Sequence, residues 1–308
     1  MAFAFLFPGQ GSQSLNMMDG FAAAVVKDTF DEASDALGDD LWAMLKADSN
    51  EAINQTINTQ PLMLAAGVAA FRAWLAAGGA RPSVVAGHSL GEYSALVAAD
   101  ALDFDDAVRL VRLRAEAMQS AVPAGEGGMA AVLGLEDADI VAACAEAAQG
   151  EVVEAVNFNA PGQVVIAGGK AAVERAIAAC KARGAKRAMP LPVSVPSHCA
   201  LMKPAAERLA EALESVSINV PVLPVLHNAD VAAYSEAAQI RDALVRQLYS
   251  PVRWTETIRK LAADGVLLHA ECGPGKVLAG LNKRIESTLS TSALTDDAAI
   301  AAVLTSLA

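Results

Sequence analysis

The sequence is poor in several features that would define other classes of protein. Its four cysteines, at 144, 180, 199 and 272, have no close pairing and no Cys-x-x-Cys spacing, which argues against a disulfide framework or a zinc site. No uncharged apolar run approaches the ~20 residues that cross a bilayer. No repeat or low-complexity tract is visible either. We therefore expect a cytoplasmic protein that has no metal site and does not enter a membrane.

Positive charge is also scarce, with 23 Lys and Arg against 35 Asp and Glu, for a formal net charge of −12. This balance disfavours general binding to nucleic acid or to an anionic membrane, because both attract an excess of positive charge. An acidic partner would have to use a local basic cluster, although such clusters are commonly just solvated faces. Two are present: Lys181, Arg183, Lys186 and Arg187, and Lys276, Lys283 and Arg284.

Short apolar runs alternate with helix-length segments along the 308 residues. The runs lie at 2–7, 83–86, 222–227 and 266–270. This alternation predicts an α/β fold with a mostly parallel sheet covered by helices. The first run has no basic leader or small-residue cleavage site before it breaks at Pro8, so we expect a buried strand rather than a signal peptide.

The stretch 124–193 has a different pattern of expected strands and helices, which predicts a small inserted subdomain. Glycine- and proline-rich connections bound it on both sides. Its expected order of strands and helices, β-α-β-β-α-β, is the ferredoxin-like pattern. The expected strands are 129–134, 152–156, 163–167 and 186–191, and the expected helices are 137–148 and 170–183. Segments 1–123 and 194–308 would then form the large domain.

The segment Val84 to Glu92 is typical of a nucleophilic serine. An apolar strand runs into Gly87-His88-Ser89-Leu90-Gly91 and then into a helix. Glycines at 87 and 91 avoid Cβ clashes where the strand and the helix meet, and Ser89 is left strained with its hydroxyl exposed. The helix start directs unpaired N–H groups at charge that develops beside Ser89.

A second glycine-rich turn, Phe7 to Gln13, follows the first strand. By analogy with hydrolase folds, the N–H after the nucleophile combines with one from another strand-ending loop, which indicates Leu90 and Gln10 as the oxyanion hole. A plain tight turn is the alternative. A phosphate-binding loop is disfavoured because no Gly-Lys-Ser/Thr follows.

A serine nucleophile needs a base, and the sequence offers four histidines. His198 lies in a proline-punctuated loop, where catalytic side chains are common, and is the best candidate. His88 should point away from Ser89, while His227 and His269 lie near strands and suit structural roles. Cys199 is expected to be a buried, inert thiol.

Arg114 is the most informative charge. Asp103 and Asp106 open a helix, and Arg114 falls in the middle of its apolar stripe. Arg109 and Arg112 instead share a face with acidic residues. A buried arginine needs a carboxylate partner, which either the protein or a substrate supplies. The planar guanidinium fits a substrate carboxylate through two parallel hydrogen bonds.

Taken together, these residues resemble the malonyl-CoA:acyl carrier protein transacylases of bacterial fatty acid synthesis over nearly the whole chain. The matching segments include 7–13, Thr59-Gln60-Pro61, 87–95, Arg114 with Met118, 157–163, 193–204, 245–248 and 273–278. The resemblance implies a hydrolase-like α/β domain with a ferredoxin-like insert, and an active-site cleft at their boundary. We expect no bound cofactor and a monomer.

The same resemblance implies roles for individual residues. Ser89 would attack the thioester of malonyl-CoA, His198 would accept and return the proton, and the N–H groups of Gln10 and Leu90 would hold the oxyanion. Arg114 would bind the free carboxylate, and a backbone carbonyl near Gln247 would orient His198. The other residues expected at the substrate are Met118, Gln60, Ser197 and Asn159.

The second half-reaction would involve the phosphopantetheine thiol of holo-acyl carrier protein. Because such a carrier is acidic, the two basic clusters become docking candidates. The same activity in a polyketide pathway remains an alternative. A serine esterase or thioesterase is a further one, although no acidic residue lies in a recognisable loop between nucleophile and histidine. A scaffold without catalysis would leave Ser89, His198 and Arg114 without a function.

Overall fold

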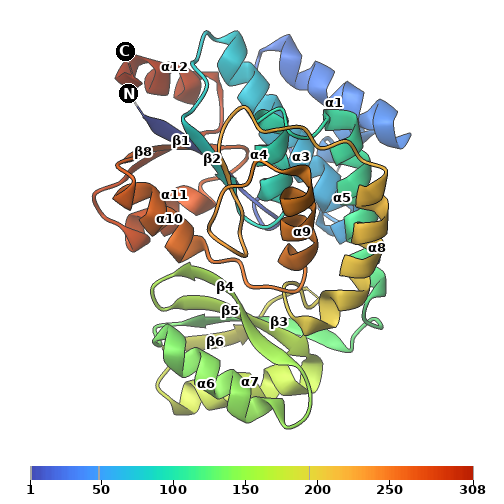
Figure 1. Ribbon diagram of the computed structural model, residues 1–308, viewed down its shortest axis with the longest axis vertical. Coiled ribbons are helices and arrows are strands. Elements are labelled where there is room, and N and C mark those ends of the chain that lie inside the picture. Colours follow the sequence, from blue (N-terminus) through green and yellow to red (C-terminus); the bar gives the residue numbers. More distant parts are fainter. Residues whose placement is uncertain (1, 48, 194, 308) are drawn as a thin grey trace.

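The large sheet carries the serine turn. The computed structural model describes residues 2–47, 49–193 and 195–307 (Figure 1). Five parallel strands pair in the order β7-β2-β1-β8-β9, which confirms the predicted α/β class with a mostly parallel sheet. Their bounds are β1 Phe3–Phe7, β2 Val84–Gly87, β7 Val225–Leu226, β8 Leu268–Cys272 and β9 Ser290–Leu294.

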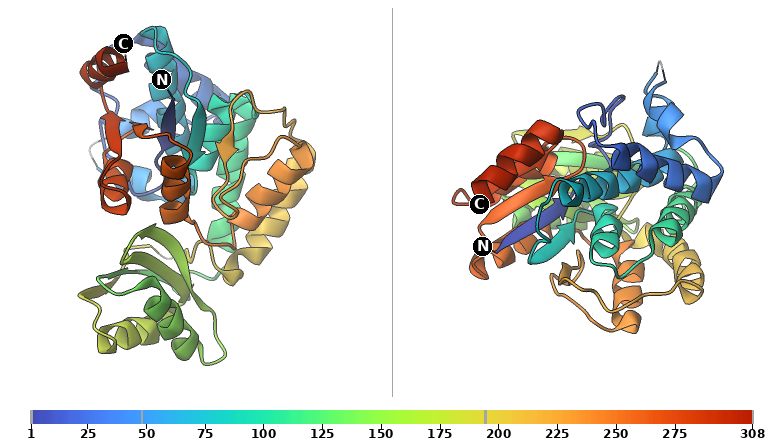
Figure 2. Two further views of the ribbon diagram at one scale, coloured as in Figure 1. Left: turned by 60° about the vertical axis from the view of Figure 1, so that its left-hand side comes forward. Right: turned by 90° about the horizontal axis from the view of Figure 1, so that it is seen from above.

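Helices cover both faces of this sheet (Figure 2). The longer ones are α1 Ala24–Leu37, α3 Thr56–Ala76, α4 Gly91–Ala98, α5 Phe104–Ser120, α8 Lys203–Glu214, α9 Ala237–Gln247, α10 Trp254–Ala263, α11 Val277–Ile285 and α12 Asp297–Leu307. The short ones are α2 Leu41–Leu45, η1 Ala52–Asn54 and η2 Ala200–Met202. In the described ranges, no helix has both the length and the apolar content needed to span a membrane.

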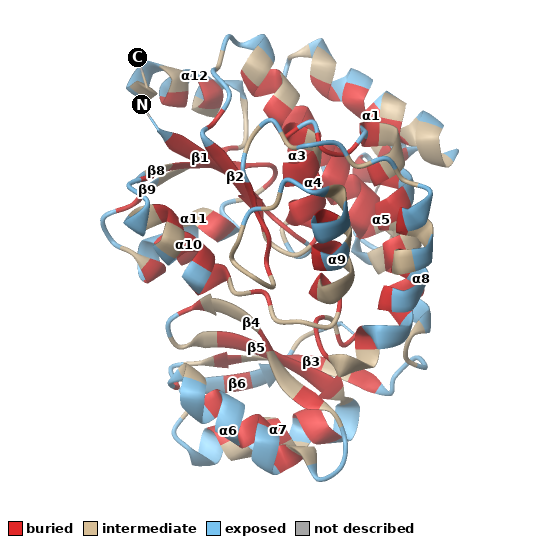
Figure 3. Ribbon diagram, viewed as in Figure 1, coloured by how far each residue is buried: buried red, intermediate tan, exposed pale blue. Residues whose placement is uncertain are grey.

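The central strand β1 is buried on both faces (Figure 3). Phe5 packs edge-on against Phe71 and Trp74 of α3, with ring centroids 5.8 and 5.3 Å apart. Leu6, which points to the opposite face, packs with α10 and α11. Because side chains alternate along a strand, a short apolar run buried on both faces becomes the middle of a helix-covered sheet. The carboxyl end of β1 is thereby fixed beside the serine turn that follows β2.

The second sheet is antiparallel, with strand order β4-β5-β3-β6. Two helices cover the face that lies away from the large sheet (Figures 1 and 2). The elements are β3 Gly127–Leu133, α6 Asp137–Ala148, β4 Val153–Ala160, β5 Gln163–Gly169, α7 Lys170–Ala182 and β6 Arg187–Pro190. All lie within the stretch 124–193 predicted as an insert, in the predicted order. Residue 194, the first of the second large-domain segment, lies outside the described residues.

Two strand predictions for the large sheet were wrong in extent, and one strand was missed. The predicted strand 222–227 is reduced to Val225–Leu226, since Pro221 and Pro224 cannot donate to a ladder and Val222 is exposed. The strand predicted at 266–270 occupies 268–272. The missed strand β9 lies at the edge of the sheet, where only Leu294 is buried, so its sequence carries no apolar run.

Candidate active site

Ser89 lies on a strained turn between β2 and α4. Its φ is +51°, a left-handed conformation that is uncommon for a residue with a side chain. The turn is so tight that a Cβ on Gly87 would lie 1.9 Å from the carbonyl of Gly91. A Cβ on Gly91 would lie 2.1 Å from the carbonyl oxygen of Phe7. The two glycines therefore allow the strand, the turn and the next helix to meet without backbone overlap.

His198 lies within hydrogen-bond distance of this serine. Its Nε2 is 2.7 Å from Ser89 Oγ, and its Nδ1 is 2.7 Å from the backbone carbonyl oxygen of Gln247. The carbonyl can only accept, so Nδ1 carries the hydrogen and Nε2 presents a lone pair to the hydroxyl. Like Ser89, His198 has a positive φ, +65°. The pair forms a nucleophile and a base, with a carbonyl in the place that an acid occupies in a Ser-His-Asp triad.

Burial keeps the imidazole neutral. Desolvation, and then the positive charge of Arg114, lower the pKa of His198 to about 3. A neutral imidazole can accept the serine proton, so the base is in its competent form at neutral pH.

Two unpaired backbone N–H groups adjoin the serine. The N–H of Ser89 itself donates to Asn228 Oδ1 at 2.7 Å. In the described ranges, neither Leu90 N–H nor Gln10 N–H donates to another protein group. Both residues line the cavity above Ser89. These two groups can bind an oxyanion that forms at the serine.

Arg114 of α5 is buried beside Ser89, with 1% of its surface exposed. Its Nη1 donates to Gln60 Oε1 at 2.8 Å, and its Nη2 donates to Gln247 Oε1 at 3.0 Å and to Ser89 Oγ at 3.3 Å. In the described part of the chain no carboxylate pairs with it, and its Nε has no acceptor. Burial lowers its pKa from the usual value, while Tyr93 and Glu92 oppose that shift. Arg114 is thus a buried cation held by neutral acceptors, with donor capacity left for an anion.

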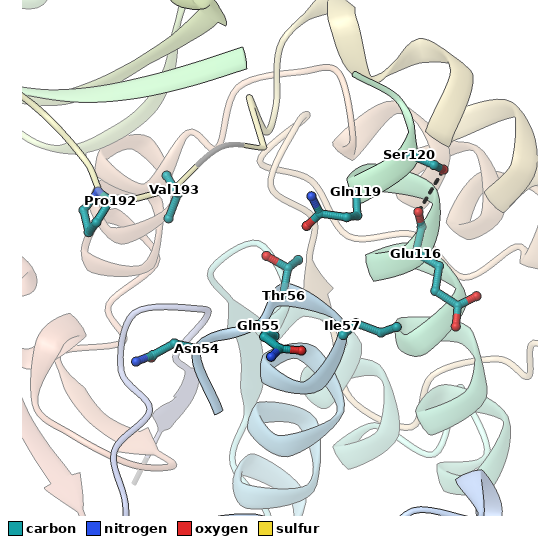
Figure 4. A pocket seen from close by; sticks show the side chains of 9 residues that line it. All are labelled: Asn54, Gln55, Thr56, Ile57, Glu116, Gln119, Ser120, Pro192 and Val193. Carbon is teal, nitrogen blue, oxygen red and sulfur yellow. Dashed lines mark hydrogen bonds between the residues drawn. The ribbon is translucent and has the colours of Figure 1, made fainter. Parts of the chain in front are cut away.

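A cavity of about 460 Å³ opens onto these groups. Its lining comes from the serine turn, the loop after β1, α5, β3, β4 and the loop that carries His198. Met118 and Ser197 both line it. A second cavity of about 610 Å³ adjoins it and shares Asn54, Thr56, Pro192 and Val193 (Figure 4). Amide and hydroxyl side chains from the start of α3 and the end of α5 line this second space (Figure 4).

Two of the expected substrate residues lie behind the cavity wall. Gln60 is fully buried and holds Arg114, and its Nε2 lies 3.5 Å from Met118 Sδ. Asn159 Oδ1 lies 2.7 Å from His88 Nε2, and Asn157, on the same strand, is the one of these two that lines the cavity. A direct contact of Gln60 or Asn159 with a substrate stays a prediction, and in this structure both residues support other side chains.

Two buried residues near Ser89, Asn228 and Glu92, were not identified from the sequence, and neither were the contacts of the Gln247 side chain. Asn228 accepts from Ser89 N–H and donates to the Gly87 carbonyl at 2.6 Å, which braces both sides of the turn. The carboxylate of Glu92 contacts His227, Asn228 and Gln247. The available signal was Glu92 as the one charged residue of α4, and its partners lie 135 or more residues away.

The remaining polar residues occupy supporting positions. His88 packs against Trp254, and His269 Nε2 lies 3.0 Å from the Val266 carbonyl. Cys199 is buried, and desolvation raises its pKa to about 12, so its thiol is poorly nucleophilic.

Arg112 differs from the expectation, since it pairs with Asp39 at 2.7 Å rather than with acids on its own helix. Within the described ranges, no group of three or more His, Cys, Asp and Glu is placed to hold a metal ion.

Comparison with known proteins agrees with this geometry. A family model described as an acyl transferase domain matches residues 4–307. The chain belongs to the acyl transferase family. A Salmonella typhimurium protein named malonyl CoA-acyl carrier protein transacylase is 59% identical to this acyl transferase over 98% of the chain and 99% of its own length. The resemblance found in the sequence motifs is thereby confirmed.

Solved structures of similar proteins have the same fold as this chain. An acyl carrier protein S-malonyltransferase from Vibrio cholerae is 58% identical with a TM-score of 0.96, covering 98% of this chain and all of the other. A malonyl-transacylase solved in complex with its type II polyketide synthase (PKS) acyl-carrier protein is 56% identical with a TM-score of 0.98. That comparison covers 99% of this acyl transferase and all of the other chain.

Proposed function

We propose that this acyl transferase moves a malonyl group from coenzyme A to the phosphopantetheine thiol of holo-acyl carrier protein. Ser89 Oγ attacks the thioester carbonyl while His198 Nε2, 2.7 Å away, takes the hydroxyl proton. The N–H groups of Gln10 and Leu90 bind the carbonyl oxygen as it becomes an anion. The carbon–sulfur bond then breaks, the coenzyme A sulfur takes the proton from His198, and malonyl-Ser89 remains.

The second half-reaction reverses these roles. The carrier thiol gives its proton to His198 and attacks the serine ester. The ester bond breaks, and Ser89 regains its proton from His198. Coenzyme A leaves the cavity before the carrier thiol enters it, so the mechanism is ping-pong. Neither half-reaction needs a bound cofactor.

The observation that carries the proposal is the position of Arg114. Among the described residues Arg114 is a buried cation without a carboxylate partner, and its Nη2 lies 3.3 Å from the hydroxyl of the nucleophile. The carboxylate of a malonyl group is one methylene away from its thioester carbonyl, so it can reach Arg114 while the carbonyl is at Ser89. A thioesterase acting on simple acyl chains has no need of this charge.

The pathway is proposed as fatty acid synthesis, with a polyketide pathway as the alternative. Relatives named malonyl CoA-acyl carrier protein transacylase support the activity, and the relative solved in complex with its type II PKS acyl-carrier protein supports the alternative. We further propose a cytoplasmic monomer, consistent with four free buried cysteines and with a site built from one chain.

Intact-mass measurement tests the proposal. The protein is incubated with malonyl-CoA and then with holo-acyl carrier protein. We expect a malonyl adduct that is absent in Ser89→Ala and that the carrier discharges as malonyl carrier. Steady release of free malonate without the carrier would indicate a thioesterase, and the absence of any adduct would indicate a scaffold.

A further inference from the structure

Glu92 is a fully buried carboxylate in the helix that follows Ser89, and the proposed reaction does not use it. Its Oε1 lies 2.7 Å from His227 Nδ1. Its Oε2 accepts from the backbone N–H of Asn228 and from Gln247 Nε2, each at 2.9 Å. Two of these three partners contact the serine turn directly, so the carboxylate is joined to the site by short hydrogen bonds.

The Gln247 side chain connects Glu92 to Arg114. The two hydrogens of its Nε2 go to the carbonyl oxygen of Ser89 and to Glu92 Oε2, both at 2.9 Å. Its Oε1 accepts from Arg114 Nη2 at 3.0 Å. An amide can turn over and exchange its oxygen and nitrogen, but a carboxylate only accepts. Glu92 and the Ser89 carbonyl, which also only accepts, therefore both hold the amide nitrogen, and the amide oxygen faces Arg114.

We propose that Glu92 is a positioning residue for acyl selectivity, whose carboxylate fixes the Gln247 amide so that its oxygen holds Arg114 beside Ser89. The inference rests on the proposed function, because Arg114 is taken to bind the malonyl carboxylate. Within the described ranges Glu92 makes no hydrogen bond to Arg114 and does not line the cavity, so its hydrogen-bonded route to Arg114 runs through Gln247, while its bond to the Asn228 N–H supports the serine turn.

Replacement by glutamine removes this constraint at nearly constant volume. The new amide can donate as well as accept, so the Ser89 carbonyl alone then holds the Gln247 nitrogen, and the amide turns its –NH2 toward Arg114 more readily. Two donors would then face each other, and the guanidinium would lose one of its fixed acceptors. A substrate with a free carboxylate depends on that guanidinium, whereas acetyl-CoA does not.

Selectivity measurements on Glu92→Gln test the proposal. Acylation of Ser89 is measured as kcat/KM with malonyl-CoA and with acetyl-CoA. We expect the malonyl value to fall about ten-fold or more, as for loss of a hydrogen bond to a charged group. The acetyl value should change by less than about three-fold, so that the ratio falls. In an Arg114→Met background, Glu92→Gln should leave the ratio unchanged, because the group through which it acts is gone.

A second buried carboxylate provides a matched control. Glu271 is also fully buried and accepts backbone N–H groups of Leu278 and Ala279 at 3.0 and 2.9 Å, and within the described part of the chain it makes no hydrogen bond to the site. Glu271→Gln should lower thermal stability and leave the malonyl-to-acetyl ratio unchanged. If Glu92→Gln does not fold, Gln247→Met tests the same connection from its other end, since it keeps the backbone carbonyl at His198 and should show the same selective loss.

The possible results are distinguishable. Equal losses with both substrates in Glu92→Gln, or a further fall of the ratio without Arg114, would overturn the positioning role. An unchanged ratio in Gln247→Met would also overturn it. A wild-type protein that malonyl-CoA does not acylate would instead contradict the proposed function itself.

Discussion

Arg114 Nη2 donates to Ser89 Oγ across 3.3 Å, although 25 residues separate the two in the chain. The cation that would bind a carboxylate and the oxygen that would attack a thioester are thus in contact before a substrate enters. This spacing suits an acyl group whose carboxylate lies close to its reacting carbonyl.

Removal of the cation should change substrate choice rather than abolish acylation. In Arg114→Ala we expect kcat/KM for malonyl-CoA to fall at least about 100-fold, since hydrogen bonds to a charged group are lost. Use of acetyl-CoA should improve, because the site no longer holds an unpaired cation. Steady-state kinetics with both substrates measure this, and unchanged malonyl kinetics would remove Arg114 from its assigned role.

An internal carboxylate should compete with the substrate for Arg114. Gln60→Glu places a carboxylate at the acceptor that lies 2.8 Å from Arg114 Nη1 and otherwise loses only a long contact to Met118. We expect a rise in KM for malonyl-CoA of about ten-fold or more. Gln60→Met, which adds no charge, is the control. A KM that rises equally in both variants would argue against competition.

The acylation rate should depend little on pH where a free histidine titrates. Since the pKa of His198 is lowered to about 3, the neutral base predominates above that pH, and kcat/KM for malonyl-CoA should be flat from pH 8 to 5. In Arg114→Met, loss of the positive charge should raise the pKa, so the fall in kcat/KM for acetyl-CoA should begin at higher pH than in wild type. A wild-type inflection near 6.5 would contradict this account.

The same shift affects stability. Between the folded pKa of about 3 and the ordinary histidine pKa of 6.5, the unfolded state binds a proton that the folded state does not. The contribution of His198 to the free energy of unfolding is therefore complete above pH 6.5 and is lost as pH falls toward 3. Denaturant titrations at several pH values measure it, and His198→Gln should show a weaker pH dependence across this window.

The tight turn at Ser89 should not tolerate a methyl group. In Gly87→Ala the new Cβ would lie 1.9 Å from the Gly91 backbone, so we expect a loss of about 3 kcal/mol in the free energy of unfolding and loss of acylation. Gly280 of α11 has open space around its Cβ position, so Gly280→Ala should be neutral or slightly stabilising. Thermal denaturation compares the two, and similar melting temperatures would contradict the steric argument.

Charge reversal should locate the carrier-docking surface. Both basic clusters are exposed, and Arg284 of the second also reaches Gln163 of the insert. Lys181→Glu with Lys186→Glu, and separately Lys276→Glu with Lys283→Glu, should leave acylation by malonyl-CoA unchanged. Charge reversal of the pair that lies at the docking surface should raise the KM for the acidic carrier. It should also weaken the dependence of that KM on salt concentration. If neither pair does so, the carrier docks elsewhere.

The sequence by itself determined the features that depend on near neighbours. The strand, turn and helix around Ser89 follow from glycine spacing, and the inward face of Arg114 follows from the period of a helix that Asp103 begins. The order of elements within 124–193 was also local, because each strand and helix carries its own periodicity. The ferredoxin-like pattern of this stretch follows from the order of its strands and helices.

Only the tertiary structure decided which distant groups meet at the serine. Asn228, Glu92 and the Gln247 side chain were missed because their contacts join residues 133 to 158 positions apart. Asn159, which is expected at the substrate, lies beside His88 at the irregularity between Phe158 and Ala160 of β4, whereas Asn157 lines the cavity. Hydrogen bonds between buried polar groups depend on sheet order and helix packing, which no local pattern specifies.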